Sequence, residues 1–316
     1  MPLLLADAKK LSQDKLTQYV IDEFRKSPLL DSLPFDNCVT PSGGNTLAYV
    51  YNRVTTLPTA AVRAINAEYT PAEAKTTQYT ANLKVFGGSF QLDRVIIENE
   101  KAVVDHVQFQ LAQKVQATVA LFHDMFINGN SGSVAEEFDG LDIALTSSST
   151  EINGAGSAIN LSSSANINSN WQAFLDQLRK VKAALNGAPS VVLMNNDMFG
   201  VFQAVMDRAG INLTSKDNYG FETVQWGNAL VMGLGDKPGT SNPIIASPAG
   251  ETSIYMARLA LDGVHGVSPA GDKLVKQYLP NMTLPGAVKT GEVEMVAAVA
   301  LKATKAAGVL RKIKIA

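Results

Sequence analysis

The sequence predicts an α+β protein in which helices are interspersed with mostly antiparallel strands. Two observations support this class. Apolar residues recur with helical spacing in a few long segments and alternate in several short ones. The two kinds of segment do not follow one another in a regular strand–helix–strand series, which argues against a parallel α/β sheet. With 316 residues, 46% of them hydrophobic, the chain can bury a large core without a metal or a disulfide.

The N-terminal region is predicted to contain one helix, an irregular arm and a strand. Residues 7–26 place apolar side chains on one helical face, and Pro28 stops that helix. Residues 27–45 hold three prolines and end near Gly-Gly, which indicates irregular structure. Cys38 lies there and is the only cysteine, so we expect a buried thiol and a reducing compartment. Residues 45–54 then alternate as a strand.

A threonine-rich excursion follows over residues 58–94. Only five of the twenty-six residues from 55 to 80 are large and apolar, so this stretch cannot bury much of its own surface. Apolar residues alternate on either side of Gly87 and Gly88, which predicts a hairpin turn at these glycines. Because isolated hairpins are marginal in water, we expect the excursion to rest on another molecule, most simply a second copy of the chain.

Residues 101–128 predict one unusually long helix. Its apolar stripe runs over about 27 residues, roughly 40 Å at 1.5 Å per residue, and Asn128 with Gly129 ends it. Residues 146–170 are mostly small and polar, so we expect loop with short strands there.

A compact helix–strand–helix unit comes next. Its first helix has Ser169 or Asn170 as cap and ends at Gly187, and its second helix closes at Gly210. A buried strand at 190–194 lies between the two helices. Further strands are predicted at 222–233, 243–247, 253–261, 291–303 and 306–315.

The charges argue against a nucleic-acid reader and against a membrane protein. The 27 basic and 29 acidic side chains form no run of one sign, so the chain lacks an electrostatic footprint for DNA or anionic lipid. The start of the chain has no basic residue before its three leucines, so we expect no signal peptide. The longest clean apolar run, 295–301, is far shorter than the roughly 20 residues that span a bilayer.

Four carboxylates crowd into the stretch 136–142, beside a glycine-rich loop. Glu136, Glu137, Asp139 and Asp142 do not have the alternate spacing of a calcium loop. We therefore predict a structural joint between two parts of the fold. In this joint Phe138 and Leu141 should be buried and Asp139 should accept hydrogen bonds from backbone amides.

Catalytic and cofactor motifs are also weak. His106 and His123 are seventeen residues apart on one predicted helix, which is too far to share a metal, and His265 stands alone. The glycine-rich stretch 233–239 is followed by prolines and not by a helix, so we expect an interstrand loop and not a phosphate loop. We predict no catalytic, cofactor-binding or metal-binding residues.

The order of the elements resembles the major capsid proteins of tailed bacteriophages, which have the Hong Kong 97-type fold. An arm, a threonine-rich excursion, one very long helix, a Phe-Asp-Gly-Leu joint, a helix–strand–helix unit and a terminal strand pair follow one another along essentially the whole chain. The resemblance implies an N-terminal arm and first strand (1–54), an extended loop (55–95), a peripheral domain with a spine helix (96–132), an axial domain (133–285) and a C-terminal return to the peripheral domain (286–316).

The resemblance implies a structural function and no enzymatic activity. The chain would assemble through pentamers and hexamers into an icosahedral shell around the double-stranded DNA of a tailed phage, which it would contact non-specifically. It would be made in the cytoplasm of the bacterial host and reside in the virion. Further implied partners are a portal protein, a decoration protein and, because the arm begins at Met1, a separate scaffolding protein. In some members a loop lysine forms an isopeptide bond with a neighbour; here Lys75 or Lys84 would supply it.

Two other functions stay open at the level of the sequence. An encapsulin-like bacterial nanocompartment resembles the same fold but holds enzymes. A soluble small-molecule enzyme built around the helix–strand–helix unit would instead be a monomer or small oligomer with a pocket.

Overall fold

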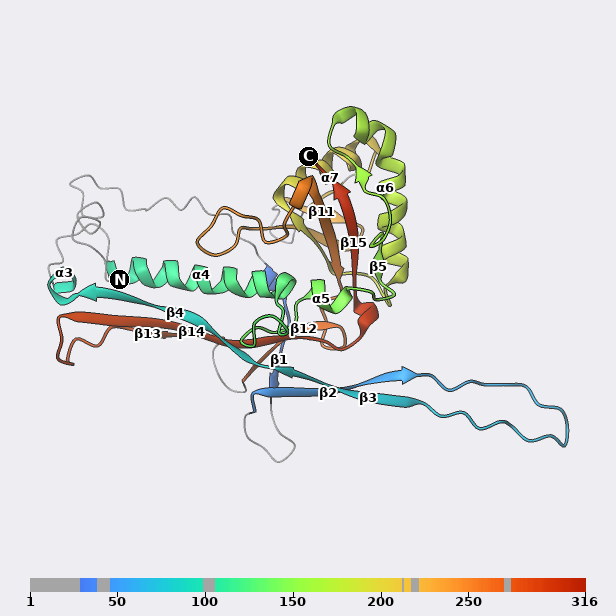
Figure 1. Cartoon of the computed structure of the whole chain (residues 1–316), viewed down its shortest axis with the longest axis horizontal. Helices are drawn as coiled ribbons and strands as arrows, with labels where there is room; N and C mark the ends of the chain where they lie inside the picture. Colours follow the sequence, from blue (N-terminus) through green and yellow to red (C-terminus); the bar gives the residue numbers. More distant parts are fainter. Residues whose placement is uncertain (1–28, 39–45, 99–105, 212, 217–221, 270–273) are drawn as a thin grey trace.

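A computed structural model describes residues 29–38, 46–98, 106–211, 213–216, 222–269 and 274–316. It confirms the α+β class, with two sheets, one long helix and a projecting hairpin (Figure 1). The predicted helix at 7–26 lies outside the described residues. The helices are α2 (Leu29–Ser32), α3 (Arg94–Glu98), α4 (His106–Asn128), α5 (Leu141–Leu145), α6 (Ser164–Ala184) and α7 (Asn196–Arg208), with 3-10 turns η1 (Pro248–Gly250) and η2 (Thr304–Ala306).

The strands fall into three sets. The five-stranded sheet holds β1 (Phe35–Cys38), β4 (Lys84–Asp93), β12 (Val264–Pro269), β13 (Val275–Tyr278) and β14 (Val288–Leu301). The hairpin is β2 (Ala48–Thr56) and β3 (Lys75–Asn82). The eight-stranded sheet holds β5 (Glu151–Ile152), β6 (Ile159–Asn160), β7 (Val191–Asn195), β8 (Thr214–Lys216), β9 (Glu222–Trp226), β10 (Ala229–Leu234), β11 (Glu251–Ala257) and β15 (Ala307–Lys314).

The five-stranded sheet is organised around β14, its longest strand. β4 runs antiparallel along one edge of β14, while β13 and β12 pair with successive parts of the other edge. The helix α4 lies along this sheet (Figure 1), and Leu111 of α4 packs with Phe90, Leu92 and Val293 of the strands. The burial of this stripe explains why the long helix forms: its apolar face is covered by the sheet along its length.

The eight-stranded sheet is covered on both faces. Helices α6 and α7 pack on one face, where Phe174 meets Phe202 edge-to-face at 6.4 Å. The other face joins a core that includes the C-terminal end of α4 and both ends of α5. Strand β7 is buried at all five positions because both faces are covered, which accounts for its continuous apolar sequence.

The predicted turn at Gly87 and Gly88 is wrong. Both glycines lie inside β4, and a Cβ on Gly87 would stand 2.2 Å from the carbonyl oxygen of Val293 in β14. The glycines therefore permit close strand approach and do not reverse the chain. The hairpin is instead formed by β2 and β3, with residues 57–74 between them, and β4 belongs to the five-stranded sheet.

Other boundaries differ from the prediction. α6 begins six or seven residues early, nearly two turns, since Ser163 accepts a hydrogen bond from the amide of Asn166 at 3.2 Å and Ile167 extends the buried stripe. No strand forms at 243–247, where Ile244 and Ile245 are buried as loop residues with one isolated bridge at Pro243. The second helix is capped by Asn195, whose side chain accepts a hydrogen bond from the amide of Met198 at 2.7 Å.

The C-terminal segment is divided between the two sheets. β14 joins the five-stranded sheet, whereas β15 pairs with β11 in the eight-stranded sheet. The resemblance implies that the segment 286–316 returns to the peripheral domain, whereas its two strands lie in two different sheets. Both strands are apolar enough to serve as central strands, and their sequence pattern does not say which neighbours they take.

Candidate functional site

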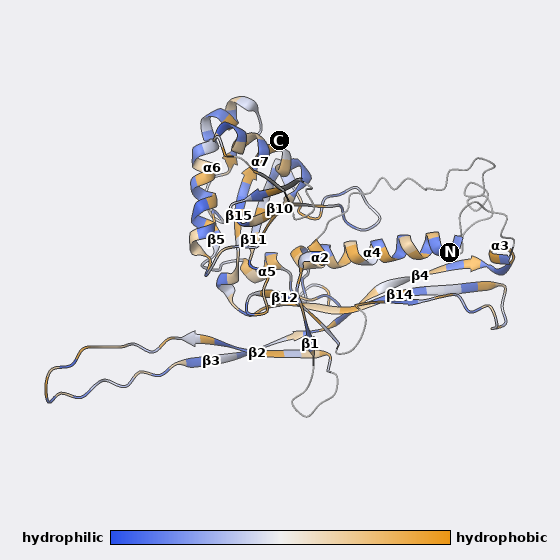
Figure 2. Cartoon of the chain, turned by 180° about the vertical axis from the view of Figure 1, so that it is seen from behind, coloured by the Kyte–Doolittle hydropathy of each residue, from blue (hydrophilic) through white to orange (hydrophobic). Residues whose placement is uncertain are grey.

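The most unusual surface of the molecule is the arm, defined here as β2, β3 and the tip 57–74 between them. Every side chain of the tip is exposed. Leu57, Val62, Ile65 and Tyr69 are exposed by 77%, 102%, 91% and 60%. Figure 2 shows that the arm stands clear of the rest of the chain. Exposed apolar side chains on an extended hairpin indicate a contact surface for another molecule.

The root of the arm is fixed to the body by one arginine and two tyrosines. The Nε of Arg53 donates to the carbonyl oxygen of Lys302 at 3.0 Å, and Nη2 donates to that of Leu301. Tyr51 also donates to Leu301, at 3.1 Å. The Arg53 guanidinium lies 4.2 Å from the ring centroid of Tyr79, which stacks on Tyr51. These contacts set the direction in which the arm leaves the body.

An open cavity of about 320 Å³ lies between this root and the stretch 129–145, which we call the joint. Its lining includes Arg53, Lys84, Glu137 and Asp139. Ser131 also lines it and donates its hydroxyl to Asp139 at 2.7 Å. No histidine or cysteine is among the residues that line this cavity.

The joint is built as predicted. Phe138 and Leu141 are 6% and 2% exposed, and Asp139 accepts from the backbone amide of Ser131 at 3.0 Å. Gly140 donates to the carbonyl of Gly129 at 2.8 Å, which returns the chain to the end of α4. A Cβ on Gly140 would lie 2.5 Å from the carbonyl oxygen of Ile127, so only glycine fits at this approach.

The four carboxylates of the stretch 136–142 do not converge. Glu137 accepts from the amide of Asn130 at 2.9 Å, and Asp139 turns to Ser131. Asp142 points to the other side of the joint, toward β15. No group of three or more potential ligands that could hold a metal occurs among the described residues.

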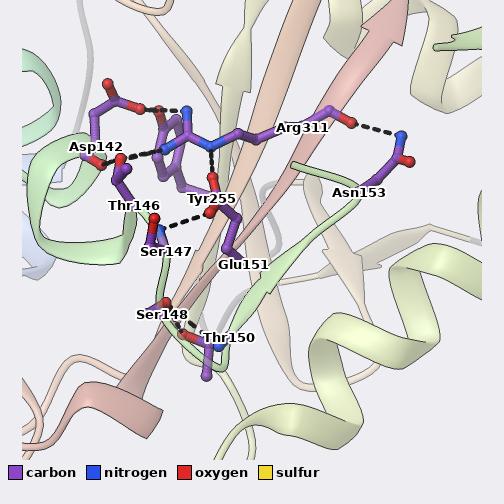
Figure 3. Close-up of polar contacts among 9 residues, drawn as sticks. All are labelled: Asp142, Thr146, Ser147, Ser148, Thr150, Glu151, Asn153, Tyr255 and Arg311. Atoms are coloured by element: carbon purple, nitrogen blue, oxygen red, sulfur yellow. Dashed lines mark hydrogen bonds and ion pairs between the residues drawn. The ribbon is translucent and has the colours of Figure 1, made fainter. Parts of the chain in front are cut away.

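Asp142 belongs to a polar cluster centred on Arg311 of β15 (Figure 3). Arg311 donates from Nη1 to Oδ1 of Asp142 at 2.6 Å and from Nε to Glu151 of β5. Tyr255 of β11 donates its hydroxyl to the same Asp142 oxygen at 2.7 Å. Burial raises the pKa of the Tyr255 hydroxyl above its ordinary value, so the hydroxyl keeps its proton. Arg311 also donates to Thr146 at 3.1 Å. The cluster ties the joint helix α5 to the eight-stranded sheet.

The end of α4 makes a second connection. Asn128 donates to the carbonyl of Ile244 at 2.7 Å, and Asp124 pairs with Lys237 at 3.2 Å. Lys237 lies in the glycine-rich stretch 233–239, whose first two residues end β10 and whose remainder is the predicted loop. A bond from the Lys237 amide to the carbonyl of Asn242 at 2.8 Å closes this loop. The long helix and the eight-stranded sheet are therefore joined at two places.

The histidines and the cysteine are buried in separate places. His106 and His123 lie in α4, His265 lies in β12, and Cys38 at the end of β1 is 1% exposed, which confirms its predicted burial. Burial raises the pKa of the Cys38 thiol to about 11. A thiol in this state is neutral and unreactive at neutral pH. No helix of the described chain is long and apolar enough to span a bilayer.

Sequence reasoning missed two arginines that connect distant parts of the described chain, Arg53 and Arg311. The partners of Arg311 lie 160 and 169 positions away, and those of Arg53 lie 248 to 251 positions away. No local spacing marks such pairs. An arginine within an apolar strand segment was the available signal, since a charged side chain there requires a partner.

Arm, long helix, joint and two-sheet body together define the Hong Kong 97-type fold. No known protein family and no curated protein sequence matches the chain. Solved structures do. The encapsulin of the holo-SrpI complex from Synechococcus elongatus PCC 7942 matches with 14% identity and a TM-score of 0.66, covering 99% of this chain and 97% of that one.

Two further structures show the same likeness. A chain of Mycobacterium phage Bobi has 13% identity and a TM-score of 0.62, with 97% of both chains covered. The capsid of the native GTA particle has 13% identity and a TM-score of 0.60, with 96% of both chains covered. These matches confirm the predicted fold over almost the whole chain.

Proposed function

We propose that the chain is a structural shell subunit that assembles with copies of itself into an icosahedral shell and performs no catalysis. The exposed tip of the arm carries this proposal. Residues 57–74 bury nothing within their own chain, yet they hold four large apolar side chains in water. Contact with a second copy would supply the missing burial, and repeated identical contacts close into a symmetric shell. The fold supports this reading, since phage, GTA and encapsulin chains share it.

We further propose that the shell encloses the double-stranded DNA of a tailed phage. Pentamers and hexamers of the chain would form the virion after synthesis in the host cytoplasm, with separate scaffolding and portal proteins and a decoration protein as partners. The formal net charge of −2 fits this role, because a strongly basic wall would hold DNA too tightly for release. Rotation of the body about α4 would accompany maturation.

An encapsulin-like nanocompartment is the second candidate. The likeness to the holo-SrpI encapsulin supports this candidate, because that chain shares the fold with a TM-score of 0.66 over 99% of this chain. The two candidates differ in what the shell holds and not in how the subunit works.

Expression of the chain alone and with its neighbouring genes tests both levels of the proposal. Light scattering and electron microscopy should detect closed particles. Nuclease-protected DNA inside purified particles supports the phage shell, and a co-purifying enzyme supports the compartment. A discrete monomer or small oligomer that turns over a small molecule would overturn both.

A further inference from the structure

His265 of β12 is buried in an unusual way at the root of the arm. Its side chain is 0% exposed, and neither ring nitrogen makes a hydrogen bond of good geometry within the described chain. Buried polar groups are nearly always paired, so an unpaired imidazole needs an explanation. Its position offers one, since His265 packs against Tyr49 of the first strand of the arm.

The ring of Tyr49, in β2, stands edge-on to the His265 imidazole with the ring centroids 5.6 Å apart. The hydroxyl of Tyr49 donates to Oδ2 of Asp36 in β1 at 2.6 Å. Lys302, just after β14, places its Nζ 3.9 Å from the same carboxylate and 5.2 Å from the Tyr49 ring. Cys38 lies further along β1 as a neutral thiol. His265 therefore faces one carboxylate, and that carboxylate is already shared by Tyr49 and Lys302.

These surroundings favour a neutral imidazole. Burial and, to a lesser extent, nearby Lys302 lower the pKa of His265 to about 4, although Asp36 and the Gly263 backbone act in the opposite direction. A proton on His265 would place a second cation near Lys302 on a side chain that is fully buried. If Tyr49 breaks its hydrogen bond to Asp36, the freed carboxylate can pair with the protonated imidazole. Tyr49 belongs to β2, so this step removes one of the contacts that hold the root of the arm, beside those of Tyr51 and Arg53.

We propose that His265 is an acid-sensitive latch for the arm: its neutral imidazole keeps β2 docked on the body, and its protonation releases the root of the hairpin. The latch acts within one chain, so it does not depend on the proposed shell. It regulates the same arm that the shell would use, and acid would free that arm before the two sheets unfold.

The sign follows from linkage. The pKa of His265 is lower in the docked state than in the open state, so docking is fully stable above the ordinary histidine pKa of about 6.5. Stability of the docked root is lost as the pH falls from that value toward 4. Between pH 7.5 and pH 5 the equilibrium constant for opening should rise roughly 10- to 30-fold.

Hydrogen exchange of the purified full chain at pH 7.5 and pH 5, corrected for the intrinsic exchange rate at each pH, tests the latch. Protection of β2 and β3 should fall 10- to 30-fold at pH 5 and should stay below that of β11 in the eight-stranded sheet, which reports opening of the whole fold. His265→Gln, which cannot be protonated, should abolish this difference. His123→Gln is the matched control, because His123 is equally buried but lies in α4, and it should keep the acid response of the arm.

Equal protection of the wild-type arm at both pH values overturns the latch, and so does an acid response that survives His265→Gln. If His265→Gln does not fold, His265→Phe keeps the ring contact with Tyr49 and serves instead. The wild-type comparison of the arm with β11 separates the two events, because equal protection of the arm and of β11 at pH 5 means that the arm opens only with the whole fold, which overturns the latch.

Discussion

Arg311 and Asp142 lie 169 positions apart in the sequence, yet Nη1 of Arg311 donates to Oδ1 of Asp142 at 2.6 Å. The side chain of Arg311 is 19% exposed and that of Asp142 is 37% exposed, so water screens the pair only in part. Because Glu151 and Tyr255 join the same cluster, one guanidinium connects the joint to two strands of the eight-stranded sheet. The angle between the long helix and this sheet is fixed there.

Removal of this guanidinium should destabilise the fold. Arg311→Gln leaves the carboxylates of Asp142 and Glu151 partly buried without their cation, and we expect a loss of about 1–3 kcal/mol in the free energy of unfolding. Chemical denaturation measures it. Arg179→Gln is the control, since Arg179 and its partner Asp176 are 60% and 65% exposed and should contribute under about 0.5 kcal/mol. Equal effects from both variants would contradict the role of the cluster.

Serine in place of the exposed apolar residues of the arm should separate folding from assembly. The triple variant Leu57→Ser, Val62→Ser, Ile65→Ser removes side chains that touch nothing buried, so the unfolding free energy should change by less than about 0.5 kcal/mol. Assembly, followed by light scattering, should weaken at least tenfold. Leu261→Ser, at a residue 50% exposed outside the arm, is the control and should assemble normally. Normal assembly of the triple variant would count against the arm as the contact surface.

Two glycines with different surroundings should respond to alanine in opposite directions. Gly140→Ala would force a Cβ within 2.5 Å of the Ile127 carbonyl oxygen, so we expect a loss of at least about 2 kcal/mol. Gly200→Ala, inside α7, meets nothing within 4 Å and should stabilise the helix by about 0.5–1 kcal/mol. Thermal and chemical unfolding of the two variants give the comparison, and a stable Gly140→Ala protein would mean that the joint does not need this close approach.

The stability of the whole fold should depend on pH through His123. Burial lowers the pKa of His123 to about 4, with Asp31 acting in the opposite direction. Since the pKa in the folded state lies below the unfolded value of about 6.5, this stabilisation is fully present above pH 6.5 and is lost as the pH falls toward 4. The loss for this residue is up to about 3 kcal/mol. His123→Gln should flatten the unfolding free energy over this pH window, and an unchanged pH profile would contradict the assignment.

Local sequence patterns predicted the parts of the fold that depend on local physics. The apolar stripe of α4, the end of the second helix near Gly210 and the burial of Phe138 and Leu141 follow from spacing, capping and turn chemistry. Each of these features is decided by residues close in the sequence. The exposed tip of the arm was also predictable, because a threonine-rich stretch with few large apolar residues cannot form its own core.

The features that were missed depend on distant partners. The sequence predicts a turn at Gly87 because it does not show that β14 approaches β4 so closely there. The placement of β15 beside β11, the anchoring of Arg53 on Leu301 and the cluster around Arg311 all join segments more than 50 positions apart. Only the folded chain brings these groups together.

Electron cryomicroscopy of the purified product tests the central claim most directly. The account predicts closed icosahedral particles in which density for residues 57–74 lies across an adjacent copy of the chain. A monodisperse monomer under every condition of expression and concentration would contradict it, as would particles in which the arm folds back on its own subunit.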